Sequence, residues 1–218
     1  MKKTLIEPTV NRWDEIFQEN GRVFNEPHPN MPSIAAKCHS RQLKKVLDLG
    51  CGSGRHLVYF AQQGFQAYGV DFSHTGLLLA RQWLDSLALP ARLHRQDMTQ
   101  PLAFPANCFD ALISIQVIHH GRLETIRSIV SEIERVLKPG GMVFVSVSMP
   151  KKRKARFKEV EPNTFLPLEG REKGLLHHFF SEDELRQVFC NFEIARVFVD
   201  STRHICLEGN KKIKKNNT

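Results

Sequence analysis

The sequence lacks several features that would assign it to a particular class of protein. Its five cysteines are scattered and form no Cys-x-x-Cys pair. This pattern disfavours a disulfide framework or a cysteine-based zinc site and indicates reduced thiols in the cytoplasm. No apolar run approaches the roughly 20 residues of a membrane-spanning helix. The first six residues briefly resemble a signal peptide, but Glu7 and Pro8 interrupt the apolar stretch, so we expect neither a leader nor a membrane segment.

Acidic residues are outnumbered, which leaves the chain basic. Lys and Arg total 31 against 23 Asp and Glu, giving a net charge of +8. A basic balance favours anionic partners, which include nucleic acids. Much of the excess lies in two clusters, at 151–158 and 211–215. A run of like charges is more often a solvated face than a binding surface, so the clusters alone do not identify a partner.

The length of 218 residues suits one α/β domain with a full hydrophobic core. No repeat, linker or second domain interrupts it. Within the single domain we distinguish an amino-terminal helical cap at 1–44, an irregular insertion at 149–176 and a basic tail at 209–218. Helical spacing of Trp13 and Phe17 supports the cap, and a second helix is expected near 33–43.

Between the cap and the tail, strand-like and helical patterns alternate. Strands are predicted at 46–49, 65–70, 92–96, 109–115 and 142–147, and helices at 55–63, 73–87 and 124–137. A helix capped at Ser181 then precedes two further strands, at 192–199 and 204–208. Alternation of this kind predicts a parallel sheet with helices on both faces and with ligands at the carboxyl ends of the strands.

The most informative stretch is the turn after the first predicted strand. Glycines occupy positions 50, 52 and 54, and a helical pattern follows at Arg55. Glycine adopts backbone angles that other residues find costly, and it lets a ligand approach the main chain. The amino end of the next helix favours an anionic group. A dinucleotide fingerprint would need glycine at Arg55, so this chain departs from that pattern.

Two more strand ends carry acids. Asp71 ends the second strand about twenty residues after the glycines, where a carboxylate usually binds ribose hydroxyls, and Asp97 follows the third strand. Glycines and two acids at three neighbouring strand ends predict a nucleoside pocket.

These motifs resemble those of the class I S-adenosylmethionine (SAM) dependent methyltransferases. Residues 48–54 (DLGCGSG) are similar to the family's first motif, 69–73 (GVDFS) to its second, 97–98 to its third, and 137–141 (LKPGG) to the turn before its fifth strand. The likeness runs from about Trp13 to near Leu207. It implies a Rossmann-like, mostly parallel seven-stranded sheet with an antiparallel carboxy-terminal hairpin, and it implies SAM as cofactor, with S-adenosylhomocysteine as product.

The resemblance also implies roles for particular residues. The backbone at Gly50, Cys51 and Gly52 would approach the methionine and ribose parts of SAM, with Asp48 ordering the glycine turn. The remaining expected cofactor contacts are Asp71 to the ribose hydroxyls, Phe72 beside the adenine, Asp97 and Met98 at the adenine edge, and Gln116 at the methionine end.

The acceptor side is less defined by the sequence. His119 and His120 follow the fourth strand, where a histidine could act as a base or orient a substrate. Trp13 in the cap and His178 are further substrate-facing candidates, although each could equally be a packing residue. No catalytic residue is assigned. Neither His119–His120 nor His177–His178 has cysteine or carboxylate neighbours at metal-ligand spacing, so no metal is expected.

Four functions compete. The first is methyl transfer to a small molecule, and the second is methylation of tRNA. Residues 161–165 and 172–175 resemble a widespread, mostly uncharacterised branch of small class I methyltransferases. Residues 115–120 resemble the wobble-uridine tRNA methyltransferases, but Ser148 and Met149 stand where that group tends to have a tryptophan. A non-catalytic SAM-fold partner is disfavoured by the intact first motif, and a nicotinamide-binding protein by Arg55.

Overall fold

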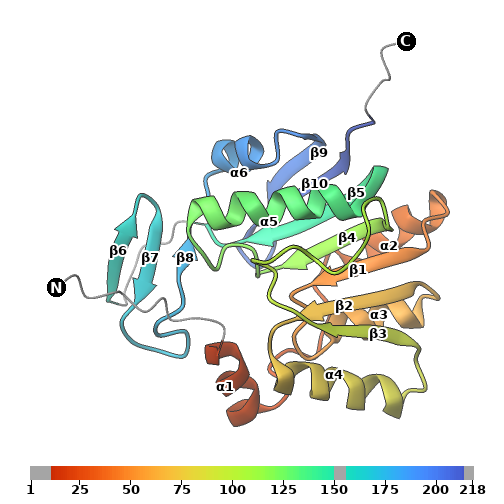
Figure 1. Cartoon of the computed structure of the whole chain (residues 1–218), viewed down its shortest axis with the longest axis horizontal. Helices are drawn as coiled ribbons and strands as arrows, with labels where there is room; N and C mark the ends of the chain where they lie inside the picture. Colours follow the sequence, from red (N-terminus) through yellow and green to blue (C-terminus); the bar gives the residue numbers. More distant parts are fainter. Residues whose placement is uncertain (1–10, 150–155, 214–218) are drawn as a thin grey trace.

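A computed structural model describes residues 11–149 and 156–213, and its main feature is a seven-stranded sheet (Figure 1). The strands of this sheet are β1 (Lys45–Leu49), β2 (Gln66–Asp71), β3 (Ala91–Arg95), β4 (Phe109–Ile115), β5 (Leu137–Val147), β9 (Phe192–Val199) and β10 (Ile205–Lys211). The helices are α1 (Asn11–Asn20), α2 (Met31–Ser40), α3 (Arg55–Gln62), α4 (His74–Ser86), α5 (Leu123–Val136) and α6 (Glu182–Val188).

The strand order is β3-β2-β1-β4-β5-β10-β9. The first five strands pair in parallel, and β10 runs antiparallel to both β5 and β9. Chain order reverses between β1 and β4, which pair with each other so that Leu47 of β1 lies opposite Leu112 of β4. Ligands of such sheets bind at this reversal, outside the carboxyl ends of the strands. The predicted fold class, a Rossmann-like sheet with an antiparallel hairpin, is confirmed.

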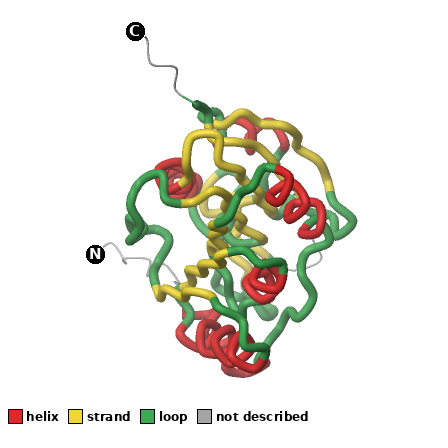
Figure 2. The backbone as a smooth tube through the Cα atoms, turned by 90° about the vertical axis from the view of Figure 1, so that its right-hand side faces the viewer, coloured by secondary structure: helices red, strands yellow, loops and turns green. Residues whose placement is uncertain are grey.

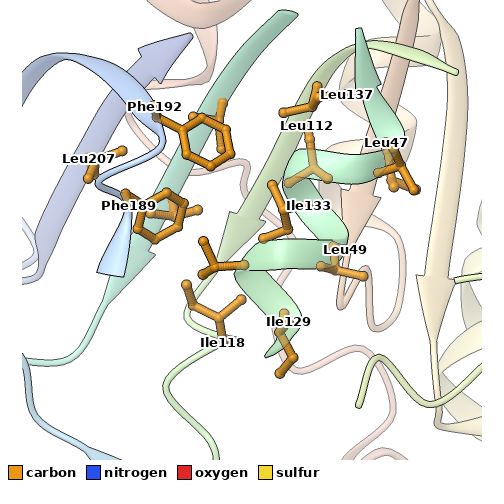
Figure 3. Close-up of a cluster of buried hydrophobic side chains, with 14 of the residues drawn as sticks. Leu47, Leu49, Leu112, Ile118, Ile129, Ile133, Leu137, Phe189, Phe192 and Leu207 are labelled. Atoms are coloured by element: carbon orange, nitrogen blue, oxygen red, sulfur yellow. The ribbon is translucent and has the colours of Figure 1, made fainter. Parts of the chain in front are cut away.

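One face of the sheet packs against α5 and α6. Alternate residues of β1, Leu47 and Leu49, point to this face and meet Ile129 and Ile133 of α5 (Figure 3). All four side chains are at most 2% exposed. Burying such a side chain contributes about 1.5–3 kcal/mol, so this layer fixes the position at which β1 ends.

The opposite face packs against α2, α3 and α4, so helices flank both faces of the sheet (Figure 2). Val46 points to this side, as does Cys206 of β10. Because side chains alternate along a strand, Asp48 also lies on this face and is 1% exposed. The helices therefore bury a carboxylate directly beneath the glycine turn.

The insertion that the sequence presents as irregular contains a second, three-stranded sheet. Its strands are β6 (Phe157–Glu161), β7 (Thr164–Pro167) and β8 (His177–His178), in the order β6-β7-β8. This prediction was therefore wrong for the described part of 149–176. The small sheet and α1 lie at the end of the main sheet where the parallel strands finish (Figure 1).

Two boundaries also differ from the sequence prediction. The turn at 137–141 is the irregular start of β5, which pairs Leu137 with Phe109 before the ladder resumes at Met142. The expected tail from 209 onward begins as strand, since β10 continues to Lys211. The Lys211 Nζ donates to the carbonyl of Leu137 at 2.8 Å. The basic residues 151–154 and 214–215 lie outside the described residues.

Within the part of the chain that the structure describes, no helix has the length and apolar character needed to cross a membrane.

Candidate functional site

The glycine turn is held closed by its own backbone. The amides of Gly50 and Cys51 both donate to the carbonyl of Val70, at 2.8 and 3.0 Å. Gly50 has φ +79°, and a Cβ there would collide with the side chain of Val117. The turn therefore needs glycine for both its backbone angle and the close approach of Val117.

Asp71 joins the end of β2 to this turn. Its Oδ2 accepts a hydrogen bond from the Gly52 amide at 2.7 Å, and its Oδ1 accepts one from the Ser73 amide at 2.8 Å. Burial raises the pKa of Asp71 to about 6, even though these two bonds act to lower it. A carboxylate fixed in this way has lone pairs left for further donors, such as a pair of vicinal hydroxyls.

Asp48 lies beneath the turn, and its carboxylate makes fewer hydrogen bonds than those of Asp71 and Asp97. Neither of its carboxylate oxygens has a hydrogen-bond partner among the described residues. A histidine approaches it from α3: His56 Nδ1 lies 3.7 Å from Asp48 Oδ2. Burial lowers the pKa of His56, so the ring is neutral near pH 7. Buried acceptors without partners are rare, and here they suit a ligand that brings donors or positive charge.

The other predicted cofactor residues follow β2, β3 and β4. Phe72 lies under the guanidinium of Arg95, 5.6 Å from the ring centroid. Asp97 Oδ1 accepts from the Thr99 amide at 2.9 Å, and Met98 packs at the edge of the core. The amide of Gln96 donates to the Asp71 carbonyl at 3.0 Å. This bond holds the ends of β2 and β3 side by side.

Gln116 takes an unusual backbone conformation as the chain leaves β4. Its φ is +60°, in the left-handed region that non-glycine residues seldom occupy. Its side-chain Nε2 donates to Ser146 Oγ at 2.7 Å, and its amide donates to the Ser146 carbonyl at 2.9 Å. These two bonds fix the turn that leads to the histidines. Strain of this kind tends to occur at functional positions.

Helix α1 covers the glycine turn. The ring of Phe17 would lie 3.0 Å from a Cβ at Gly52 and 3.1 Å from one at Gly76. The Oδ1 of Asp14 accepts from Ser73 Oγ at 2.6 Å and from the Thr75 amide at 2.8 Å. The helix is therefore attached to the start of α4 and lies over the space between the strand ends.

The chain matches a family described as a methyltransferase domain over residues 47–145. An uncharacterized methyltransferase from Synechocystis is 35% identical over 49% of this chain and 47% of its own length. A tRNA U34 carboxymethyltransferase from Hydrogenovibrio crunogenus is 36% identical over 49% of this chain and 33% of its own length. The chain thus spans about half or less of the length of these relatives.

Solved structures share the fold. A SAM-dependent methyltransferase from Methanosarcina mazei superposes with a TM-score of 0.71 at 23% identity, covering 87% of this chain and 100% of that one. A Burkholderia thailandensis N1-methyltransferase, with 1,6-didemethyltoxoflavin and S-adenosylhomocysteine bound, gives 0.67 at 21% identity and covers 94% and 88%. The chain therefore has the fold of these SAM-dependent methyltransferases, and the methyltransferase-domain family matches it over residues 47–145.

S-adenosylhomocysteine is bound in the Burkholderia neighbour, and the residues at the strand ends of this chain fit such a cofactor. Asp71 offers acceptors for hydroxyls, and Asp48 offers buried acceptors beneath the glycine turn. The assignment of individual contacts stays a prediction.

Three histidines lie together beyond the end of β4, where the sequence predicts that the acceptor binds. His119 and His120 follow β4 as expected, with ring centroids 4.2 Å apart. The third is His177 of β8, whose ring centroid lies 4.6 Å from that of His120. Sequence reasoning named His178 instead. Alternation along β8 separates the two rings, and the nitrogens of His178 lie 2.8 Å from Thr164 Oγ1 and 3.1 Å from Glu184 Oε2.

His119 and His120 are held neutral. Burial lowers the pKa of His119 well below its usual value, and nearby His120 lowers it further. Burial lowers the pKa of His120 to about 4. Near pH 7 these rings can orient a substrate, but their weak basicity makes them poor proton acceptors. Trp13 of α1 packs against His120, which places this predicted substrate-facing residue at the same end of the site.

Proposed function

We propose that the chain is an enzyme that transfers a methyl group from SAM to a small-molecule acceptor, bound beside His119, His120 and Trp13. The observation that carries this proposal is the enclosure of the acceptor end. His119 is 2% exposed, and His177 is 6% exposed. A site formed by such buried rings suits a compact molecule.

The charge around this end supports the same choice. Residues 156–176, which include β6 and β7, contain four basic residues (Arg156, Lys158, Arg171, Lys173) and four acidic ones (Glu159, Glu161, Glu169, Glu172). A surface that binds a phosphate backbone has a clear basic excess. The balance at 156–176 favours a small acceptor, whereas the basic run at 151–154 directly before it favours the nucleic-acid alternative.

The sulfonium of SAM carries an already activated methyl group. The acceptor would attack this methyl carbon in line and displace S-adenosylhomocysteine as the leaving group. The tasks of the protein are then to align the two reactants and exclude water. Asp71 and the glycine turn would orient the cofactor, α1 would close over it, and the small sheet would bound the acceptor. We assign the cap at 1–44 and the insertion at 149–176 to these covering roles within one domain.

Methylation of tRNA is the second candidate. It is favoured by the net charge of +8 and by the likeness to a tRNA U34 carboxymethyltransferase. If it is correct, Arg156 and Lys158 should contact phosphates together with the basic residues before them, and binding should weaken steeply with salt.

Labelling with methyl-labelled SAM tests both candidates. The chain is incubated with a small-molecule fraction of cell extract or with bulk tRNA, and the labelled product is separated by size. We expect label in the small-molecule fraction and none in tRNA. Asp71→Asn, run in parallel, identifies label that comes from a contaminating methyltransferase. Salt-sensitive labelling of one nucleotide position would overturn the small-molecule proposal. Label in neither pool would favour a non-catalytic partner.

A further inference from the structure

Two separate segments bring three imidazoles together at the acceptor end. His119 and His120 come from the turn after β4, and His177 comes from β8 of the small sheet. One potential ligand atom from each ring lies within 4.8 Å of the other two. The spacing of His177 along the chain gives no hint of this grouping, which only the second sheet creates.

Each ring also has one nitrogen facing a polar group outside the cluster. His119 Nε2 lies 3.2 Å from Ser148 Oγ, and His177 Nε2 lies 3.3 Å from Glu172 Oε2. His120 Nδ1 donates to the carbonyl of Leu176 at 3.2 Å. Metal-binding histidines have outer partners of this kind, which fix the ring orientation and the position of the proton.

One nitrogen of the cluster is left unsatisfied. His119 Nδ1 is buried and has no hydrogen-bond partner among the described residues. The His119 ring has imidazoles on two sides, with centroids 4.2 Å away for His120 and 5.6 Å for His177. A buried polar atom without a partner requires an explanation. A ligand shared by the three rings would supply one.

Spacing along the chain led us to expect no metal, but that spacing does not reveal a grouping that β8 creates. We propose that His119, His120 and His177 bind one divalent transition-metal ion of the zinc class. Imidazole is a preferred ligand of such ions. In a tetrahedral site with Zn–N distances near 2.0–2.1 Å, nitrogens lie about 3.4 Å apart, so small rotations of the rings bring them into place. Three protein ligands leave a fourth position open, as in zinc sites that hold a water or a substrate.

The ion's binding does not depend on the proposed function, but its use does. If the acceptor is a small molecule, the open position would hold its oxygen, sulfur or nitrogen donor beside Trp13. A bound metal lowers the pKa of such a donor. The three histidines would then position the nucleophile by holding the ion to which it binds.

A second group of potential ligands is already satisfied by its own contacts. His28, Asp200 and Cys206 also lie close together. However, His28 Nε2 is 2.7 Å from Asp200 Oδ2, and Asp200 Oδ1 accepts from the amides of Thr202 and His204. This group connects the segment before α2 to the hairpin turn. In a metal titration, this group is the site that would compete with the three histidines for the ion.

Cobalt titration of the untagged chain, after treatment with a chelator, tests the proposal. We expect one Co²⁺ per chain with a dissociation constant that is about micromolar or tighter, the visible absorption of a four-coordinate nitrogen site, and displacement by Zn²⁺. His177→Gln should weaken binding by about 100-fold or more, because it removes a ligand. His74→Gln changes an exposed histidine on α4 and should bind Co²⁺ like the parent.

Glu172→Gln is a second test of the site that can still be read if the buried His177→Gln variant misfolds. Its side chain is 39% exposed, and loss of an outer partner typically costs 10–100-fold in metal affinity, so we expect at least about tenfold weaker binding with an unchanged circular dichroism spectrum. Parental affinity in both His177→Gln and Glu172→Gln would overturn the proposal. So would a thiolate-to-cobalt absorption band that Cys206→Ser removes.

Binding of S-adenosylhomocysteine, measured on the same samples, separates this proposal from the proposed function. Intact cofactor binding without any metal binding would overturn only the metal site.

Discussion

Trp13 and His120 lie edge to face, with ring centroids 5.9 Å apart and an interplanar angle of 69°. One turn further along the same helix, Phe17 packs over Gly52. Helix α1 therefore contacts both the glycine turn and the histidine cluster. A movement of this helix would open the cofactor and acceptor ends together. The predictions below follow from this arrangement.

Cofactor affinity should depend on pH through Asp71. Its pKa is raised to about 6 by burial, so the carboxylate is ionised above pH 6 and takes up a proton below it. The protonated form is a poorer acceptor for the Gly52 amide and for hydroxyl groups. We expect the dissociation constant of S-adenosylhomocysteine to be flat above about pH 7 and to rise up to about tenfold per unit well below pH 6. Calorimetry from pH 5 to 8 measures this. A flat profile in the parent would contradict the role given to Asp71.

Ser73 should couple the stability of α4 to the position of α1. Its Oγ accepts from the Gly76 amide at 2.8 Å as a helix cap and also donates to Asp14. Ser73→Ala should lower the free energy of unfolding by about 1 kcal/mol and should speed amide hydrogen exchange in α1.

Ser181 provides the matched control, because it caps α6 by accepting from the Glu184 amide at 3.2 Å, without contact to α1. Ser181→Ala should cost a similar free energy, measured by denaturant unfolding, and leave exchange in α1 unchanged. Equal exchange in the two variants would mean that Ser73 does not hold the helix.

The covering segments should respond to the cofactor. We expect amides of α1, of 27–32 and of 156–176 to exchange faster in the free protein than with saturating S-adenosylhomocysteine. Strands β1 and β4, buried at the centre of the sheet, should stay protected in both states. Trp13 fluorescence should change on binding, because its ring lies at the site. Unchanged exchange in all three segments would show that they are not a cofactor-linked cover.

Much of the fold could be predicted from the sequence because its signals are local. The apolar run at β1, the glycines after it and the acid after β2 each depend on a few adjacent residues. Ser73 and Ser181 were both identifiable as helix caps, and both accept the expected backbone bond. Where the chain follows such local rules, the predicted and observed elements differ by only a few residues.

The small sheet was missed because its signal is weak. Lys158 and Glu159 alternate poorly with their apolar neighbours, and a register shift interrupts the pairing of β6 with β7. One usable cue was present at the turn between these strands, where Asn163 has φ +62°. Asparagine tolerates this conformation better than most residues.

The histidine cluster could be predicted only in part. His119 and His120 follow directly from the end of β4, since strand ends define the site. His177 depends on how β8 pairs with β7, where Phe165 lies opposite it. The register of β8 against β7 decides which of the two adjacent histidines faces His120. The residues next to 177–178 in the sequence do not determine that register.

If the glycine turn and Asp71 bind SAM, the protein should bind S-adenosylhomocysteine and not NAD. Calorimetry with these two ligands measures this directly. We expect binding of S-adenosylhomocysteine in the micromolar range, about −8 kcal/mol, and no measurable heat with NAD. Asp71→Asn should lose about 1.5–3 kcal/mol of that affinity. Asp85→Asn, at an exposed position on α4, should bind like the parent. Binding of NAD with no response to S-adenosylhomocysteine, or parental affinity in Asp71→Asn, would contradict this assignment.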